Sequence, residues 1–476
     1  MCPIPLEVVV LKKRKLSLNS VAAFNFLGPV VLNGLSFLTM PLFTRLLGTA
    51  NYGSYTNYNS YLSILAVLVG FQAAGAIAPT SIRYDSRERD RVFSNIMTAA
   101  LASAILIGSL VAIFRNAISE FTGLPKHMLV VLFFHAMGMF AVQFSTTKFA
   151  YDKESHKTFL VSVMISVVSI LLSVLLICTM PAHIAPYESY IYGHAVPYIL
   201  AGFGLMVYFL LKGKSFFDKK HWAYVLALCL PLIFHQLSNS LLHQCDKIML
   251  KRITGDSFAG IYGFAVTFST IMSIIWAALN NTFIPFYHDD IKAENPAALR
   301  KKTKNYLYLF TSLTMGFVLV MPEVVKIFAS RDFWQGIELI PLLVLGAYFV
   351  FLYSFPVNFE FYHCRTKTIA VGTGCAALVN IILNTTLIPG FGMLGAAVAT
   401  VVSYLFLWLF HLFVAKVVIK EAYHFDFRFF YGYLIAVLLL IGLYYLIADL
   451  WLIRWLIFTV IAIALLIKTY KQKSLF

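Results

Sequence analysis

The stretch RLLGTANYGSY, residues 45–55, returns as RITGDSFAGIY at residues 252–262. Four positions agree at one constant offset of 207 residues: Arg45, Gly48, Gly53 and Tyr55 match Arg252, Gly255, Gly260 and Tyr262. A weaker match, YGHAV (192–196) with LGAAV (394–398), lies near the end of each half. Each long copy also sits between two extended apolar runs. We therefore interpret the chain as an internal duplication.

The composition is that of a membrane protein. The 476 residues are 60% hydrophobic and 12% charged, and the mean hydropathy is +0.81, which is too apolar for a soluble domain. A helix of about 20 apolar residues crosses a bilayer core of about 30 Å. Fourteen runs meet this length: 18–44, 58–82, 92–114, 128–150, 159–181, 189–211, 222–246, 259–284, 305–328, 337–361, 368–388, 394–419, 429–446 and 451–469. The last two are the least certain pair, because IADLWLIRW (447–455) leaves little room for a turn.

The positions of the basic residues indicate which side of the membrane each loop faces. The net charge is +16, and 28 of the 37 Lys and Arg residues fall on one side of the predicted membrane, against 9 on the other. Because positive loops stay in the cytoplasm, both termini are predicted to be cytoplasmic. This distribution explains the basic charge without a nucleic-acid partner.

Six predicted spans per repeat is an even number, so both halves enter the membrane in one orientation and form a parallel repeat. We predict an all-α integral membrane protein with two six-helix lobes around a cleft, plus two C-terminal helices. The expected domains are residues 1–212, residues 213–420, and residues 421–476 with a cytoplasmic tail. In the repeated turn, Gly48 and Gly255 are expected to end helices in a left-handed conformation.

Polar residues at membrane depth are costly and often face a cavity. At 100° per residue, the seventh run places a polar stripe within an arc of about 140°, formed by His235, Ser238, Asn239, His243 and Asp246. The first run carries a similar stripe that includes Asn25 and Asn33. We predict that both stripes line the substrate pathway. Packing between helices, which also favours small and polar residues, stays open as the alternative.

Other candidates are single residues or small groups. His135 is a further pathway candidate, and a hydrogen-bonded structural histidine is the alternative. Lys247 is a candidate cation, although it can also form a local pair with Asp246. Glu360 and Arg365 are candidates for an inner gate, with a solvated interfacial cluster as the other interpretation.

Signals for catalysis, metals or nucleotides are missing. The six cysteines show no ligand spacing, so no metal site, cofactor or disulfide framework is predicted. LKGKS (211–215) lacks the first glycine of a phosphate-binding loop, since Tyr208 occupies that position. No catalytic residue is assigned, and transport driven by an ion gradient or the membrane potential is favoured.

Three segments resemble one family. PLFTRLLGTANYGSY (41–55), QCDKIMLKRITGDSFAGIYGFA (244–265) and NIILNTTLIPGFGMLGAAVAT (380–400) resemble the polysaccharide-export and O-antigen flippases of the multidrug/oligosaccharidyl-lipid/polysaccharide exporter superfamily. The resemblance implies a flippase for undecaprenyl-diphosphate-linked oligosaccharide in the bacterial cytoplasmic membrane. The implied partners are that lipid-linked oligosaccharide, the lipid bilayer and other membrane proteins of polysaccharide assembly. Two alternatives stay open: a membrane polysaccharide polymerase or ligase, and a multidrug antiporter of the same superfamily.

Overall fold

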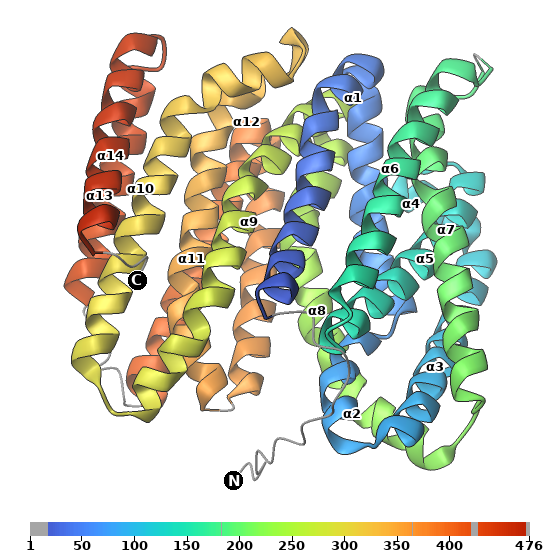
Figure 1. The fold of residues 1–476 in the computed structure, drawn as a ribbon. Coiled ribbons are helices and arrows are strands. Elements are labelled where there is room, and N and C mark those ends of the chain that lie inside the picture. The colour runs from blue at the N-terminus through green and yellow to red at the C-terminus, as the bar shows by residue number, and fades with distance from the viewer. Residues whose placement is uncertain (1–17, 182, 364, 420–426, 473–476) are drawn as a thin grey trace. The chain divides into compact units, whose positions relative to one another are not determined.

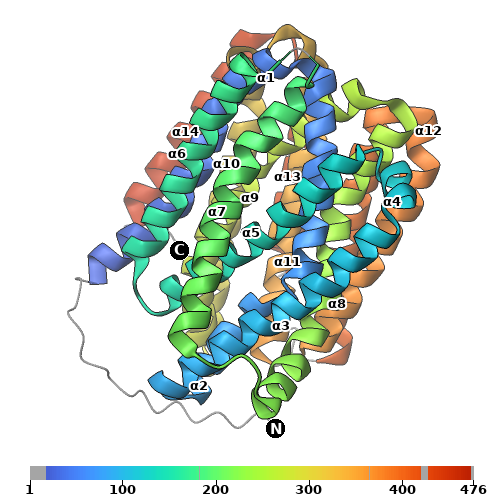
Figure 2. The same ribbon diagram turned by 90° about the vertical axis from the view of Figure 1, so that its right-hand side faces the viewer.

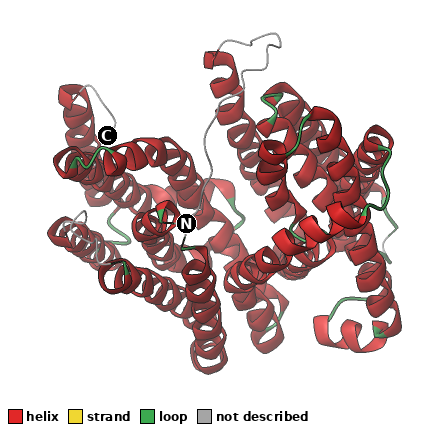
Figure 3. Ribbon diagram, turned by 90° about the horizontal axis from the view of Figure 1, so that it is seen from below, coloured by secondary structure: helices red, strands yellow, loops and turns green. Residues whose placement is uncertain are grey.

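The computed structural model describes residues 18–181, 183–363, 365–419 and 427–472, with side chains except at 18–36, 155, 427 and 472. Figures 1 and 3 show an entirely helical chain over these ranges, without a strand. The α-helices are α1 (Leu18–Val69), α2 (Ile77–Arg83), α3 (Ser86–Ile113), α4 (Arg115–Thr122), α5 (Lys126–Tyr151), α6 (Ser155–Thr179), α7 (Pro186–Gly213), α8 (Lys219–Thr254), α9 (Asp256–Lys292), α10 (Pro296–Phe328), α11 (Ile340–Tyr362), α12 (Thr366–Phe413), α13 (Phe427–Leu446) and α14 (Trp451–Gln472). Shorter elements are the 3-10 segments η1 (Ala73–Ala76) and η2 (Arg331–Leu339) and the π-helical η3 (Val414–Val418).

The helix lengths agree with the predicted spans. Within the described ranges, eleven helices are long and apolar enough to cross a membrane, or twelve when a bent pair near residue 70 is included. Two of the long helices, α1 with 52 residues and α12 with 48, exceed a single crossing. Each contains one glycine at positive φ, Gly48 at 65° and Gly392 at 54°, where two helices meet. Division at these glycines accounts for all fourteen apolar runs, so the predicted fold class is confirmed and the chain is a multi-pass membrane protein.

The repeated turn has the same backbone in both copies. Gly48 has φ 65° and ψ 177°, and Gly255 has φ 95° and ψ 176°. The positive φ was expected, but ψ near 180° places both residues outside the left-handed helical region. That combination of angles is open essentially to glycine alone. Glycine is therefore needed here for an extended reversal between two helices.

The second glycine of each copy allows the two copies to touch. A Cβ added at Gly53 would overlap the carbonyl oxygen of Asp256, and one added at Gly260 would overlap that of Thr49. Thr49 and Asp256 are themselves equivalent at the 207-residue offset. The contact is therefore reciprocal, and it brings the two helix starts to backbone distance.

Contacts divide the chain into two compact units. Unit 1 contains the described part of Met1–Leu47 together with Ser54–Gln244, and unit 2 contains Gly48–Gly53 together with the described part of Cys245–Phe476. The first part of α8 belongs to unit 1, where Leu232 packs against Gly75. The boundary between the units thus lies within α8. The domain limits after residues 212 and 420 stay a prediction.

Unit 1 is built on close helix packing. α3, α5 and α7 pack together, as Figure 2 shows, around a core that includes Phe93, Phe144 and Phe209. A Cβ at Gly202 of α7 would overlap the backbone of Gly138 in α5. Small residues let transmembrane helices approach this closely, because lipid itself offers no hydrophobic force to hold them together.

In unit 2, α14 is fixed to α10 near both of its ends. Arg454 forms a bidentate ion pair with Glu323 and donates to the carbonyl oxygen of Leu319 at 2.7 Å. At the far end of α14, the Lys468 ammonium lies 3.4 Å from the centre of the Tyr308 ring. The turn between α13 and α14 consists of residues 447–450. The sequence IADLWLIRW therefore does hold a tight turn, and its arginine is the residue that anchors α14.

We predict that Gly260→Ala destabilises the protein by about 1–3 kcal/mol, because the added Cβ meets backbone that cannot rotate away. Thermal unfolding of the purified protein in detergent measures the effect. Gly204→Ala is the matched control, since a Cβ there meets nothing within 4 Å. Equal melting temperatures for the two variants would contradict the reciprocal contact.

Candidate functional site

Unit 1 contains a cluster of histidines and tyrosines at membrane depth. His135 of α5 is 4% exposed, and its Nδ1 lies 3.2 Å from the hydroxyl of Tyr58 in α1. The ring centre of Tyr198 in α7 lies 5.5 Å from that of His135. The Tyr198 ring also stacks on the ring of His194, with 6.4 Å between the ring centres. Three helices thus supply a histidine–tyrosine cluster, defined here as these four residues.

The depth of this cluster explains why His135 has a hydrogen-bond partner. His135 is nine residues into α5, about 14 Å from the start of the helix. An ionisable side chain at such depth requires a hydrogen-bond partner, and Tyr58 provides one. The predicted pathway role of His135 stays a prediction, because the same bond also satisfies a structural histidine. Tyr58 was missed because 77 residues separate it from His135.

The predicted stripe on α8 crosses the boundary between the units. His235, Asn239 and His243 lie in unit 1, whereas Asp246 and Lys247 lie in unit 2. His243 is exposed, and His235 and Asn239 are partly exposed. These exposures are compatible with a polar surface on α8. The assignment of the stripe to the substrate pathway stays a prediction.

Asp246 is embedded within unit 2. It is 3% exposed, and its carboxylate accepts a 2.7 Å hydrogen bond from the hydroxyl of Tyr262 in α9. The hydroxyl of Thr400 in α12 lies 3.4 Å from the same oxygen, and the backbone N–H of Lys247 donates at 2.8 Å to the other. The carboxylate therefore links three helices. This network favours a positioning role over a purely local pair with Lys247.

Glu360 lies in a second buried network of unit 2. Its side chain is fully buried, with one oxygen 2.5 Å from His411 Nδ1 and the other accepting from Thr368 at 2.5 Å. Arg365, by contrast, is exposed and reaches Glu360 only through a backbone N–H to carbonyl bond of 2.9 Å. The pair proposed for an inner gate is thus a buried carboxylate and an exposed cation. The solvated-cluster interpretation does not fit Glu360, and the gate role stays a prediction.

The side chains of two predicted pathway residues, Asn25 and Asn33, lie outside the described residues. Among the described residues, no group of three or more His, Cys, Asp and Glu side chains is arranged to hold a metal ion.

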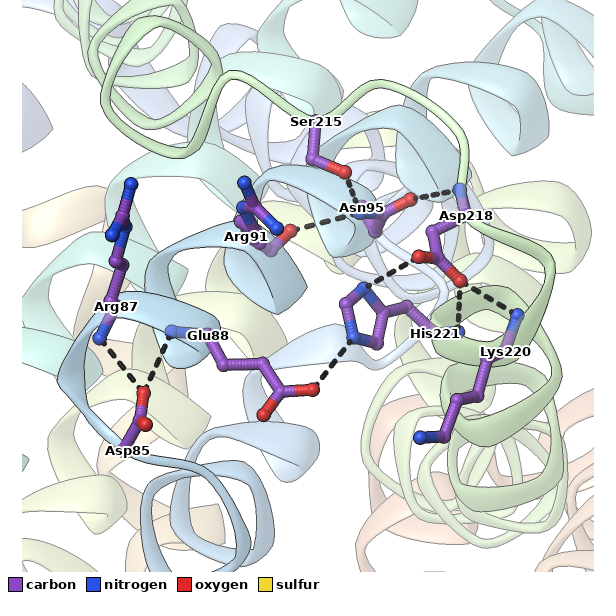
Figure 4. Close-up of polar contacts among 9 residues, drawn as sticks. All are labelled: Asp85, Arg87, Glu88, Arg91, Asn95, Ser215, Asp218, Lys220 and His221. Atoms are coloured by element: carbon purple, nitrogen blue, oxygen red, sulfur yellow. Dashed lines mark hydrogen bonds and ion pairs between the residues drawn. The ribbon is translucent and has the colours of Figure 1, made fainter.

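Figure 4 shows how the linker between α7 and α8 is held against α3 in unit 1. The side-chain amide of Asn95 donates to Ser215 Oγ at 2.9 Å, and its oxygen accepts from the backbone N–H of Asp218 at 2.8 Å. His221 is 5% exposed and lies between two carboxylates, at 3.6 Å from Glu88 and 3.8 Å from Asp218. This arrangement could not be predicted from sequence spacing, because Asn95 is 120 and 123 residues from the two positions that it binds.

Asp218 also caps the first turn of α8. Its Oδ1 accepts from the backbone N–H groups of His221 at 3.3 Å and Lys220 at 2.9 Å (Figure 4). The bond from His221 is the main reason that the pKa of the Asp218 carboxyl is lowered. A lowered pKa means that the charged form stabilises the fold, so this contribution is present above the ordinary aspartate range and is lost on acidification.

We predict that hydrogen exchange at Lys220 and His221, corrected for its intrinsic pH dependence, becomes faster as the pH falls below about 4. Asp218→Asn is the matched control, because asparagine caps a helix equally well but does not titrate. In that variant the acid-induced rise should be absent. A similar rise in both proteins would show that the Asp218 carboxylate is not the cause.

For the buried pair Glu360–His411, we predict that each single alanine substitution costs about 3–5 kcal/mol of stability, since one polar group is then buried alone. The double variant should cost less than the two single changes added together. Unfolding in denaturant measures all three. Arg365→Ala, an exposed neighbour, should change stability by less than about 0.5 kcal/mol. Strict additivity would show that the two side chains do not interact.

The comparisons with known proteins agree with this fold. The family described as "Polysaccharide biosynthesis protein" matches residues 21–288, more than half of the chain. One relative, "Lsg locus putative protein 1" of Haemophilus influenzae, is 24% identical over 74% of this chain and 86% of its own length. A second from the same organism, an "Uncharacterized membrane protein", is 21% identical over 82% of this chain and 93% of its own.

Solved structures show the same helical arrangement. The fold is similar to that of "Lipid II flippase MurJ, inward closed conformation", with a TM-score of 0.65, 17% identity, and coverage of 95% of this chain and 99% of the other. It is also similar to an inward-facing multidrug resistance MATE family transporter of the MOP superfamily, with a TM-score of 0.55, 12% identity, and coverage of 84% and 96%. The predicted family is confirmed: the chain belongs to the polysaccharide biosynthesis protein family, and its fold is similar to that of these transporters.

Proposed function

We propose that this protein is a flippase that moves undecaprenyl-diphosphate-linked oligosaccharide units, of O-antigen or exopolysaccharide, across the bacterial cytoplasmic membrane. The observation that carries the proposal is the match to a polysaccharide biosynthesis family over residues 21–288 on a chain that crosses the membrane many times. The similarity in fold to a lipid II flippase supports it. The excess of positive charge on one side supports cytoplasmic termini.

In this mechanism, the two repeats rock around a polar pathway and expose it to one side at a time. His235, Asn239 and His243 of α8 replace water around the head group, while the lipid tail stays in the bilayer. The membrane potential supplies a driving force, because moving negative charge outward gains about 2.3 kcal/mol per charge per 100 mV. A diphosphate with two charges gains about 5 kcal/mol at that potential without ATP. Other polysaccharide-assembly proteins of the membrane are its proposed partners.

Two other functions predict different outcomes. A polymerase or ligase would act on units that have already reached the outer leaflet. A multidrug antiporter would not affect the distribution of the lipid-linked oligosaccharide at all. The position of that lipid in cells lacking the protein therefore separates all three.

We predict that cells without the protein accumulate lipid-linked oligosaccharide in the inner leaflet, and that the wild type restores translocation. At matched membrane levels, His235→Ala, Asn239→Ala and His243→Ala should each slow translocation about tenfold, as expected for loss of one hydrogen bond to a charged group. The control on the same helix is Phe234→Ala, which removes an exposed apolar side chain.

Unpolymerised units on the outer leaflet would overturn the flippase in favour of the polymerase, and a normal lipid distribution would favour the antiporter. Full activity of all three α8 variants would leave the flippase proposal standing, and it would assign the polar stripe to helix packing.

A further inference from the structure

Unit 1 contains a large apolar groove that the transport proposal does not use. Its volume is about 790 Å³, within the range of roughly 300–1,000 Å³ typical of ligand sites. It lies among α3, α5 and α7, where Ile105, Val130, Phe134 and Phe203 contribute to an apolar wall. Ile105, Val130 and Phe134 are themselves exposed at 69%, 56% and 40%, so the groove opens along an apolar face of the unit.

The dimensions of the groove match one leaflet of a bilayer. Its lining on α3 runs from Leu101 to Ala112, eleven residues apart, which corresponds to about 16 Å of helix. Half of a hydrocarbon core is about 15 Å thick. A lipid tail that entered beside Arg115 would therefore follow α3 to about the middle of the membrane.

One end of the groove is cationic. Arg115 at the start of α4 and Lys126 at the start of α5 both line it, and both are exposed. Neither has an ion-pair partner in the part of the chain that the structure describes. His127 lies beside them and pairs with Glu188 at 3.1 Å. Two unpaired cations above an apolar channel are complementary to a phosphate head group on a lipid tail.

The predicted membrane topology supports a role for these two cations. The side predicted to be external carries only 9 of the 37 basic residues, and Arg115 and Lys126 are the two in their loop. Positive residues are generally excluded from external loops. Here both of those present in the loop border the same groove.

We propose that this groove binds an anionic phospholipid of the outer leaflet, with its phosphate at Arg115 and Lys126 and an acyl chain along α3. Exposed cations attract a phosphate only weakly, so mass action favours an abundant anionic phospholipid over a scarce carrier lipid at such a site. Bilayer phospholipids greatly outnumber a carrier lipid in the membrane. The site is separate from the α8 stripe and does not depend on the transported substrate.

The test titrates the full-length protein, stripped of lipid in a neutral detergent, with phosphatidylglycerol and with zwitterionic phosphatidylethanolamine, and follows binding by native mass spectrometry. Wild type should retain one phosphatidylglycerol with a preference over phosphatidylethanolamine. Arg115→Gln with Lys126→Gln should weaken phosphatidylglycerol binding about tenfold and abolish that preference. Ser109→Phe, at an exposed position of the lining, should block the groove and release the lipid without removing a charge.

The control variant, Lys326→Gln with Arg331→Gln, removes two exposed cations on the same predicted side of the membrane that do not line the groove, and it should bind as wild type does. Binding of phosphatidylglycerol by the Arg115 and Lys126 variant with unchanged affinity would overturn the proposal. Displacement of phosphatidylglycerol by equimolar undecaprenyl phosphate, lost in the same variant, would also overturn it and assign the groove to the carrier lipid.

Discussion

The reciprocal contact between the two copies of the repeated turn constrains the rest of the fold. Gly53 and Gly260 each leave room for a backbone carbonyl of the other copy, so neither position tolerates a side chain. Gly48 and Gly255 reverse the chain just before these contacts with angles that only glycine adopts readily. Four glycines thus fix where two pairs of long helices begin and end. The polar groups carried by those helices take their places from this arrangement.

Three buried ionisable groups among the described residues each have a hydrogen-bond partner on another helix. His135 meets Tyr58, Asp246 meets Tyr262, and Glu360 meets His411. Uncompensated charge at membrane depth is costly, so such pairs hold helices together as well as satisfying the charge. The assignment of the less buried polar groups of α8, His235, Asn239 and His243, to a substrate pathway stays a prediction.

Much of the fold was predictable, because bilayer thickness fixes the length of a spanning helix. The orientation that the positive-inside rule favours stays a prediction. The duplication was visible from matching glycines. The hydrogen-bonded pairs of side chains were not predictable. His411 lies 51 residues from Glu360, and only the packing of α11 on α12 brings the two together. The same holds for Asn95 and the α7–α8 linker. Sequence periodicity identifies the face of a helix that is polar, but not the helix it meets.

The two attachments of α14 tie its tilt to that of α10. Arg454 and Lys468 are fourteen residues apart, about 21 Å along the helix, and both bind α10. Most of the surface between them is exposed on α14. A helix fixed at two points cannot slide, so a thicker or thinner bilayer must tilt α14 and α10 together. Lipid composition would then act on unit 2 mechanically, through hydrophobic mismatch along this outer pair of helices.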